Sequence, residues 1–331
     1  MESLFSINER MIFMRSEMEK RTFGVELEFG GITRETAVKA VKHVLVNKEQ
    51  MFTYESIRSL NNCYYTLQVT DISGRNWSVQ RDSSVAGDGG ESCELVTPIL
   101  RGTSDILLLQ DVVRAIRQKG GRVNKTCGMH VHIGAKDYIP QNLRILSNMW
   151  HSRQPILYAG CLVNSENRNV NYCQPLSDDF IDRLNKIKPQ DWLTFWQQWY
   201  YDYEHISNLA DVFIVSARHY HDSRYHSLNL HSFNMRRTIE FRLFNGTLHA
   251  GKVKTAVQLC LALVCCAKEK TKATAKVPDV VRQNPAFAMR TWLNQLGLMG
   301  EEYKTLRHFM YLELPGNAAW RYGSPTKRRN S

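Results

Sequence analysis

Two histidines, His130 and His132, stand one residue apart in the otherwise apolar run CGMHVHIG. Side chains of a β-strand alternate between two faces, so both imidazoles would share one face and Met129, Val131 and Ile133 the other. Imidazole is a common metal ligand, but histidines also lie on solvated sheet faces without a function. The pair alone leaves both interpretations open.

Charged residues alternate with apolar ones in three further segments that are typical of strands. The charged faces carry Glu26 and Glu28 in RTFGVELEFG, Asp82 and Glu94 in WSVQRDSSVAGDGGESCELVTPIL, and Glu240 and Arg242 in RRTIEFRLFNG. The second of these segments predicts two short strands joined by a glycine-rich turn. Together with the histidines, four segments distant in sequence offer side chains of the types that bind metal ions.

Glu26 and Glu28 require a nearby positive charge. Same-face neighbours on a strand stand roughly 6.5 to 7 Å apart, and two carboxylates that close on a half-buried face repel each other. Arginines could supply the charge in a ladder of ion pairs, which is the simpler interpretation of any one segment. A ladder has no use for two histidines, however, and needs more cations than these strands contain. The combined pattern favours divalent metal ions.

The ligand types indicate which metal would bind. Carboxylates mixed with one or two imidazoles suit Mg²⁺ or Mn²⁺ better than structural zinc. The 8 cysteines form no C-x-x-C pair, which argues against a zinc ribbon or finger. They are typical of reduced thiols in a cytosolic protein.

Four motifs, FGVELEFG, ELVTPIL, GMHVHIG and TIEFRLFNG, in this order, resemble the amidoligase family. That family is a branch of the group that contains glutamine synthetase and glutamate–cysteine ligase. The resemblance extends roughly from residue 22 to residue 266. It implies an α+β fold like the catalytic domain of glutamine synthetase, with a curved, mainly antiparallel sheet, helices on one face and a charged catalytic cleft on the other. The periodicity of the segments supports these layers.

The resemblance also implies a role for each charged residue. The implied metal ligands are Glu26, Glu28, Glu94, His130 and Glu240. The implied contacts to nucleotide or phosphate are His132, Arg224 and Asn229. Arg242 would stabilise the γ-phosphate or the acyl phosphate, and Asp82 would either complete the acidic cluster or accept the proton of an incoming amine.

The chemistry implied by the resemblance is ATP-dependent. A carboxylate is a poor acylating agent, so ATP would first convert it to an acyl phosphate. Two or three Mg²⁺ or Mn²⁺ ions and an arginine would neutralise the phosphate oxygens during that transfer. An amine would then attack and form an amide or isopeptide. The expected partners are small-molecule, peptide or protein carboxylates and amines.

Two other classes of protein remain open. A metal-dependent hydrolase, an amidase or phosphoesterase, would use the same His/Glu cluster to activate water and would need no nucleotide for turnover. A catalytically inactive binding module would be free to lose Glu26, Glu28, His130 or Glu240, and all four are present.

The segments between the motifs predict the elements that position them. Helical spacing covers residues 33–49, 103–119, 140–160 with a bend or break at Pro155, and 249–270, while residues 58–70 are predicted to be a strand. The expected organisation is an N-terminal helical extension (1–20), a catalytic domain (21–270) with an insertion or lid (161–220), C-terminal helices (271–315) and a disordered basic tail (316–331). Within the insertion, Arg168 would be a surface residue or a substrate contact.

The net charge is +11, from 43 lysines and arginines against 32 acidic residues. ATP and an acidic substrate would favour such a charge, whereas the bases are scattered and no nucleic-acid motif is present. No run approaches the roughly eighteen apolar residues of a membrane span, and no signal peptide opens the chain. The expected location is therefore the cytoplasm, without a nucleic-acid or membrane partner.

Overall fold

The computed structural model describes residues 7–49, 57–160, 162 and 172–322. Within these ranges the strands form one open sheet with the order β2-β3-β4-β5-β1-β7-β9-β8, and β6 pairs with β1. All pairs between these strands are antiparallel. The prediction of an α+β fold with a mainly antiparallel sheet is confirmed. The strands are β1 (Thr22–Phe29), β2 (Arg58–Ser59), β3 (Leu67–Thr70), β4 (Asn76–Gln80), β5 (Cys93–Val96), β6 (Leu100–Arg101), β7 (Gly128–Gly134), β8 (Leu228–Asn229) and β9 (Thr238–Asn245).

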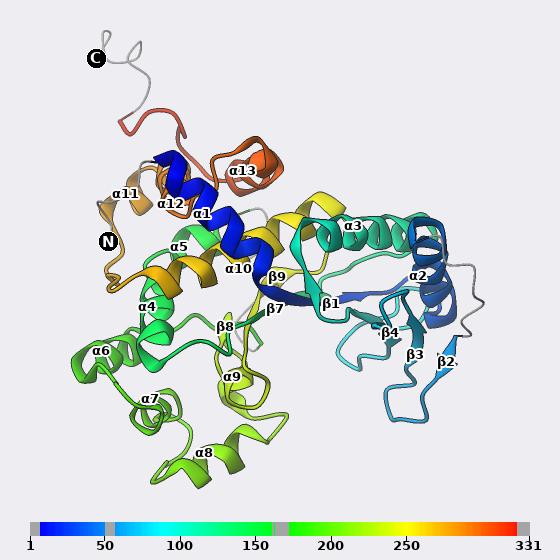
Figure 1. Ribbon diagram of the computed structural model, residues 1–331, viewed down its shortest axis with the longest axis horizontal. Helices are drawn as coiled ribbons and strands as arrows, with labels where there is room; N and C mark the ends of the chain where they lie inside the picture. The colour runs from blue at the N-terminus through cyan, green and yellow to red at the C-terminus, as the bar shows by residue number, and fades with distance from the viewer. Residues whose placement is uncertain (1–6, 50–56, 161, 163–171, 323–331) are drawn as a thin grey trace.

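Helices lie before, between and after the strands in the sequence, and some of them cover the sheet (Figure 1). The first five are α1 (Ile7–Lys20), α2 (Arg34–Glu49), α3 (Gly102–Gln118), α4 (Pro140–His151) and α5 (Gln154–Tyr158). The helices of the middle segment are α6 (Asp178–Ile187), α7 (Trp192–Trp199), α8 (Leu209–Ser216), the 3-10 turn η1 (Asp222–Arg224) and α9 (His231–Arg236). The last group is α10 (Ala250–Glu269), α11 (Asp279–Gln283), α12 (Pro285–Gln295), η2 (Glu301–Tyr303) and α13 (Lys304–Tyr311).

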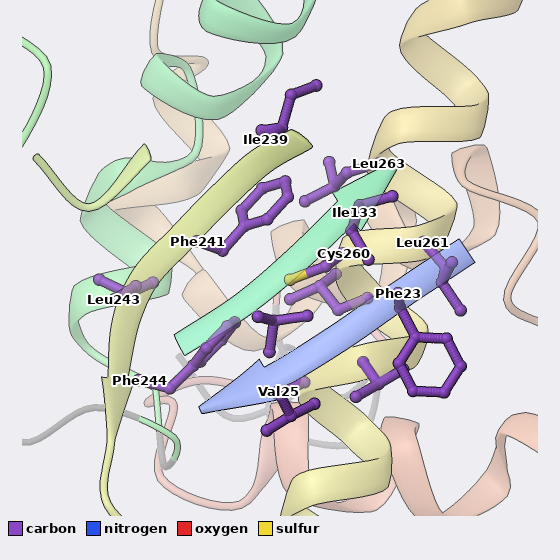
Figure 2. Packing of buried hydrophobic residues seen from close by; sticks show 14 of the residues in the cluster. Phe23, Val25, Ile133, Ile239, Phe241, Leu243, Phe244, Cys260, Leu261 and Leu263 are labelled. Atoms are coloured by element: carbon purple, nitrogen blue, oxygen red, sulfur yellow. The ribbon is translucent and has the colours of Figure 1, made fainter. Parts of the chain in front are cut away.

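The apolar face of the sheet packs against α10, as the sequence predicted. Phe23, Val25 and Leu27 of β1 are at most 2% exposed, because every second residue of the strand points into the core. Figure 2 shows Phe23 and Val25 beside residues of β7, β9 and α10. The charged residues of β1, at the alternate positions, therefore lie on the opposite face of the sheet.

Helix α10 forms the centre of the core. Its length and composition match those of a membrane span, and 83% of its most apolar window is buried inside the molecule. The helix contacts β7 on one side and α1, α3, α4 and α13 on others. An all-round apolar helix needs such all-round partners, which explains why its 3.6-residue pattern fades near Cys265 and Cys266.

The predicted strand over residues 58–70 is wrong in its middle. β2 and β3 are separated by a turn in which Asn62 Oδ1 accepts hydrogen bonds from the backbone N–H groups of Tyr64 and Thr66. Tyr65 takes a positive φ of 48°, which a strand does not allow. Asparagine side chains compete with sheet ladders through such local bonds.

Other predictions of local structure have clear outcomes. The predicted helix break near Pro155 is confirmed, because α4 ends at His151 and α5 begins at Gln154. Residues 316–322 contact the body of the protein, where the Asn284 side-chain amide donates to the backbone carbonyls of Asn317, Trp320 and Arg321. Arg168 and residues 323–331 lie outside the described residues.

Candidate active site

Charged side chains of β1, β5, β7 and β9 meet on the face of the sheet opposite α10. Strand pairing places Glu26 directly opposite His130, and Glu240 directly opposite His132. Directly paired residues of antiparallel strands point to the same face. The structure therefore brings the ligand-type residues of four distant segments onto one wall.

Glu26 lies between the two imidazoles. Its Oε2 is 3.1 Å from His130 Nδ1, and its Oε1 is 3.2 Å from His132 Nε2. Burial alone would raise the pKa of Glu26, but the positive charge of His132 and the hydrogen bond with His130 outweigh it and hold that pKa well below the usual range. Burial would lower the pKa of His132, but the charges of Glu26 and Glu240 raise it overall.

Glu28 and Glu94 form the second acidic pair, directly opposed on β1 and β5. Glu28 Oε2 accepts a 2.5 Å hydrogen bond from the Gly128 backbone N–H, and Glu94 Oε2 accepts a 2.7 Å hydrogen bond from Gln80 Nε2. Burial, together with the negative charge of Glu26, raises the pKa of Glu94 well above its usual range. The residues thus form a strongly electronegative part of the wall.

Asp82 belongs to this part of the wall, in the turn that follows β4. Its Oδ1 accepts hydrogen bonds from the backbone and side chain of Ser84, at 2.7 Å and 2.6 Å. One oxygen each of Asp82, Glu28 and Glu94 lie within 4.8 Å of one another. The glycine-rich turn between Asp82 and Glu94 therefore brings their two carboxylates close together.

Glu240 is held by two neighbours on the other side of the wall. Arg242 Nη1 lies 2.5 Å from Glu240 Oε1, and Asn229 Nδ2 donates to Glu240 Oε2 at 2.7 Å. Burial would raise the pKa of Glu240, but the charges of Arg242 and then of His132 lower it to about 2. Asn229 is 1% exposed and also accepts the His231 backbone N–H, so this geometry makes it a support for Glu240.

The donor atoms of the wall suit divalent ions. Three sets each offer ligand atoms within 4.8 Å of one another, namely Glu26 with His132 and Glu240, Glu26 with Glu94 and His130, and Glu28 with Asp82 and Glu94. His132 Nε2 is buried without a hydrogen-bond partner among the described residues, although a carboxylate oxygen lies nearby. Oxygen-rich sets with a few imidazoles are those that Mg²⁺ and Mn²⁺ prefer. The residues present therefore fit the expected metal ions.

Arg224 is placed differently from these residues. Its Nη1 donates to the His219 carbonyl at 2.6 Å, and its guanidinium lies 5.8 Å from the ring centres of Tyr220 and Tyr225. The contacts found for Arg224 thus belong to its own segment, between α8 and β8. Arg224 is not a member of any of the three ligand sets.

A cavity of about 740 Å³ adjoins the wall where Glu26 and His132 lie. Gly24 and Gly134 line it. A Cβ at Gly24 would meet no atom closer than Thr97 Oγ1 at 3.8 Å, so the missing side chain leaves room over the sheet there, whereas at Gly134 the Thr22 side chain fills that space. Six cationic residues also line it, namely Lys20, Arg21, Arg101, Lys136, Arg236 and Arg237. Arg21 is paired with Asp137 at 2.7 Å, and Lys20 with Glu17 at 2.8 Å.

Four of these cations are exposed and have no ion pair within the described ranges, namely Arg101, Lys136, Arg236 and Arg237. Their unneutralised charge makes the cavity attractive to an anion. The sequence analysis did not single out these residues. The sequence did contain one indication of them, the pair Arg236 and Arg237 directly before TIEFR. Residues that precede a strand of the wall lie at the edge of the wall.

The match to known families identifies the class of protein. The family described as "Putative amidoligase enzyme" matches residues 19–264, which include all the strands of the wall. The chain belongs to this amidoligase family. The recognition made from the four motifs is thereby confirmed, and membership supports a carboxylate–amine ligase in general.

Comparison with individual proteins adds little to the family match. Among solved structures, the amidoligase is similar to a bifunctional glutathione synthetase from Pasteurella multocida, at 14% identity and a TM-score of 0.41. The similarity covers 92% of this chain and 48% of that one, so the amidoligase spans about half the length of that enzyme. No curated protein matched.

Proposed function

We propose that this amidoligase joins a carboxylate to an amine at the expense of ATP, through an acyl phosphate. The observation that carries the proposal is the position of the anion-attracting cavity directly beside the carboxylate and imidazole wall, with Glu26 and His132 belonging to both. Such an arrangement suits a substrate whose phosphates must reach metal ligands. We also propose that the fold is like that of the catalytic domain of glutamine synthetase.

The cavity would take the nucleotide. Its unpaired cations, Arg101, Lys136, Arg236 and Arg237, would neutralise the phosphate chain. Gly24 would let that chain lie close to the sheet. His132 would then lie against the phosphates, at the border between the cavity and the metal ligands. Bound divalent ions would neutralise the γ-phosphate oxygens during transfer.

The reaction would proceed in two steps. In the first, a carboxylate oxygen of the substrate attacks the γ-phosphorus, the bond to the β-phosphate oxygen breaks, and ADP leaves. In the second, the amine nitrogen attacks the acyl carbon, the carbon–nitrogen bond forms, and phosphate leaves with the electron pair of the carbon–oxygen bond. The proton that the amine loses would pass to a carboxylate of the wall, for which Asp82 is the candidate because its loop position is partly exposed.

Arg242 would act on the transferred phosphoryl group. Its guanidinium is already held at the wall by Glu240, so little ordering is needed when charge develops. Glu240 and Asn229 position it from the side of β8 and β9. We further propose that the substrates are amino acids, peptides or proteins, that the enzyme works in the cytoplasm, and that no nucleic acid takes part.

Product formation in a mixed substrate pool tests the proposal. The protein would be incubated with Mg²⁺, ATP and a pool of amino acids and peptides, while ADP release and product masses are followed. A ligase of this kind releases ADP continuously only when acid and amine are both present, and its products are lighter than the combined reactants by one water. Metal-dependent turnover without nucleotide would instead establish the hydrolase.

A further inference from the structure

The end of β9 breaks the alternation that the sequence suggests. In a regular strand, Phe244 would share the charged face with Glu240 and Arg242, and Asn245 would point into the core. The pairing shows otherwise, because Val131 is opposite Phe241 whereas Met129 is opposite Phe244. The two steps from Met129 to Val131 on β7 are therefore matched by three steps from Phe241 to Phe244 on β9, which is a β-bulge.

The bulge exchanges the faces of the last two residues of β9. Phe244 is 1% exposed, and Figure 2 shows Phe241 and Phe244 on the side of the strand that faces Cys260 of α10. Asn245, the next residue, must therefore point to the charged face. Bulges that re-aim a side chain are common beside active sites.

The backbone holds Asn245 firmly in this position. It is paired directly with Gly128, its backbone N–H donates to the Leu162 carbonyl at 3.0 Å, and the next residue crosses very close to β7. A side chain at Gly246 would place its Cβ 2.5 Å from Cys127 Cβ, so only glycine allows the crossing. The position of Asn245 is thus defined from both sides.

Asn245 and Gly128 continue a row of residues across the sheet. Gly128 donates its backbone N–H to Glu28, Glu28 is opposite Glu94, and Glu94 is opposite Gln80. Strands lie ~4.8 Å apart, so Asn245 and Glu28 are two strand spacings from each other with only a glycine between them. Because Gly128 has no side chain, no side chain of β7 separates the Asn245 amide from the Glu28 carboxylate here, and we call this position over Gly128 the gap.

The buried atom of Asn245 determines which group fits the gap. Asn245 Oδ1 is buried and has no hydrogen-bond partner among the described residues. An unpaired buried acceptor is costly and calls for a donor. On the far side of the gap, the negative charge of Glu28 repels a carboxylate and attracts an ammonium. We infer that Asn245 is a specificity-determining residue for the amine substrate, whose N–H groups it accepts over Gly128.

This inference rests on the proposed ligase, because it assigns the amine a place opposite the nucleotide cavity. The cavity lies beyond Glu26 and His132, whereas Asn245 lies beyond Glu28, at the other end of the same wall. The activated acyl group would be made between them. The amine would then approach from the side of the wall that carries Glu28, Glu94 and Asp82.

Two substitutions of similar size test the inference by kinetics. Hydroxylamine is the amine probe, a pool of amino acids and peptides supplies the acid, and hydroxamate is measured. Asn245→Leu removes the acceptor and should raise the apparent KM for hydroxylamine about ten- to a hundred-fold, with the KM for ATP changed by less than about twofold. Asn245→Asp keeps an acceptor and should stay within about threefold of the wild type.

The same pair of variants distinguishes an amine from a carboxylate. A carboxylate bound through the Asn245 amide N–H would be lost in Asn245→Asp as fully as in Asn245→Leu. Equal loss in both variants, or no change of the KM for hydroxylamine in Asn245→Leu, would overturn the inference. Circular dichroism and thermal unfolding of each variant serve as the control for folding.

A second measurement does not depend on catalysis. Crystals with saturating Mg²⁺ would be soaked in thallium(I), a monovalent cation of about the size of ammonium, and located by anomalous scattering. We expect a site at Asn245 Oδ1 over Gly128 in the wild type and its loss in Asn245→Leu. A wild type without thallium there contradicts the inference. If thallium binds there but no acid and amine release ADP, the ligase proposal fails and the cation site remains.

Discussion

Glu28 and Glu94 are directly opposed on neighbouring strands, both at most 6% exposed, with their carboxylates on the same wall. Like charges at such positions destabilise a sheet. The pKa of Glu94 is raised by burial, then by the charge of Glu26, and less by the charges of Asp82 and Glu28. Divalent ions bound between these carboxylates would neutralise the repulsion, and the other ligand-type side chains of the wall support such binding.

Neutralising Glu94 should therefore separate stability from metal binding. Without metal, in EDTA, Glu94→Gln should be as stable as the wild type or more stable by about 1 kcal/mol, because a like-charge pair is removed. With Mn²⁺, the variant should gain much less in melting temperature than the wild type gains. Denaturant unfolding and thermal melts measure the two effects.

A nearby carboxylate outside the wall provides the matched control. Glu91 contacts Arg34, with Oε2 accepting the Arg34 backbone N–H at 2.7 Å and Oε1 lying 3.3 Å from the guanidinium. Glu91→Gln should keep the full stabilisation by Mn²⁺. Full stabilisation in Glu94→Gln as well would show that Glu94 holds no ion.

Arg242 and Glu240 should behave as a coupled buried pair. Arg242→Met leaves Glu240 buried beside other carboxylates, and should lower the free energy of unfolding in EDTA by about 3–5 kcal/mol. The double variant Glu240→Gln with Arg242→Met removes both charges and should recover most of that loss, without recovering activity. Urea unfolding of the two single variants and the double variant gives the coupling energy. A double variant as unstable as Arg242→Met would contradict the pairing.

His231 should make the protein sensitive to acid. Its Nδ1 accepts from the Tyr200 hydroxyl at 2.9 Å, and its Nε2 lies 3.0 Å from the Arg218 carbonyl, an arrangement that suits a neutral ring. Burial lowers the pKa of His231 to about 4. An unfolded chain takes up the proton near pH 6.5, so the folded state loses about 3 kcal/mol as pH falls from 6.5 to 4 and little more below that.

Two readings test this pH dependence. The ring signals of His231 should titrate near pH 4 in NMR spectra of the folded protein, and a titration above pH 6 would contradict the account. The unfolding free energy of His231→Gln should fall less steeply between pH 6.5 and 4 than that of the wild type. Some slope should remain, because burial also lowers the pKa of His226.

Arg236 should contribute to nucleotide binding through the phosphates. It lines the cavity without an ion pair in the described part of the protein. Arg236→Gln should weaken MgATP about tenfold, because a charge-assisted contact is lost, and should change AMP affinity much less. Lys39→Gln removes the same charge from a surface pair with Glu35 and should leave both affinities unchanged. Equal loss of AMP and MgATP would place Arg236 away from the phosphates.

The parts of the fold that depend on local alternation could be predicted from the sequence. The alternation of apolar residues predicted the buried face of β1, which consists of Phe23, Val25 and Leu27. The apolar segment 249–270 likewise predicted the core helix, because a side chain's position in the pattern determines whether it is buried. The convergence of Glu26 with His130 followed from the family resemblance. The pattern of any one segment alone did not predict this convergence.

The remaining parts depend on contacts that alternation does not encode. The bulge that turns Asn245 outward requires the register of β7 against β9, and the turn at Asn62 requires a side chain to compete with a ladder. The cavity combines residues from α1, β6 and α9 that no motif joins. Such features become visible only when distant segments are placed together.

Transfer of an oxygen atom tests the central claim most directly. An acyl phosphate requires that an oxygen of the substrate carboxylate leave with the phosphate. With ATP, Mg²⁺, an amine and a pool of amino acids and peptides labelled with ¹⁸O in their carboxylates, the released phosphate should carry one labelled oxygen. Phosphate without label, or phosphate labelled only from H₂¹⁸O, would contradict the account.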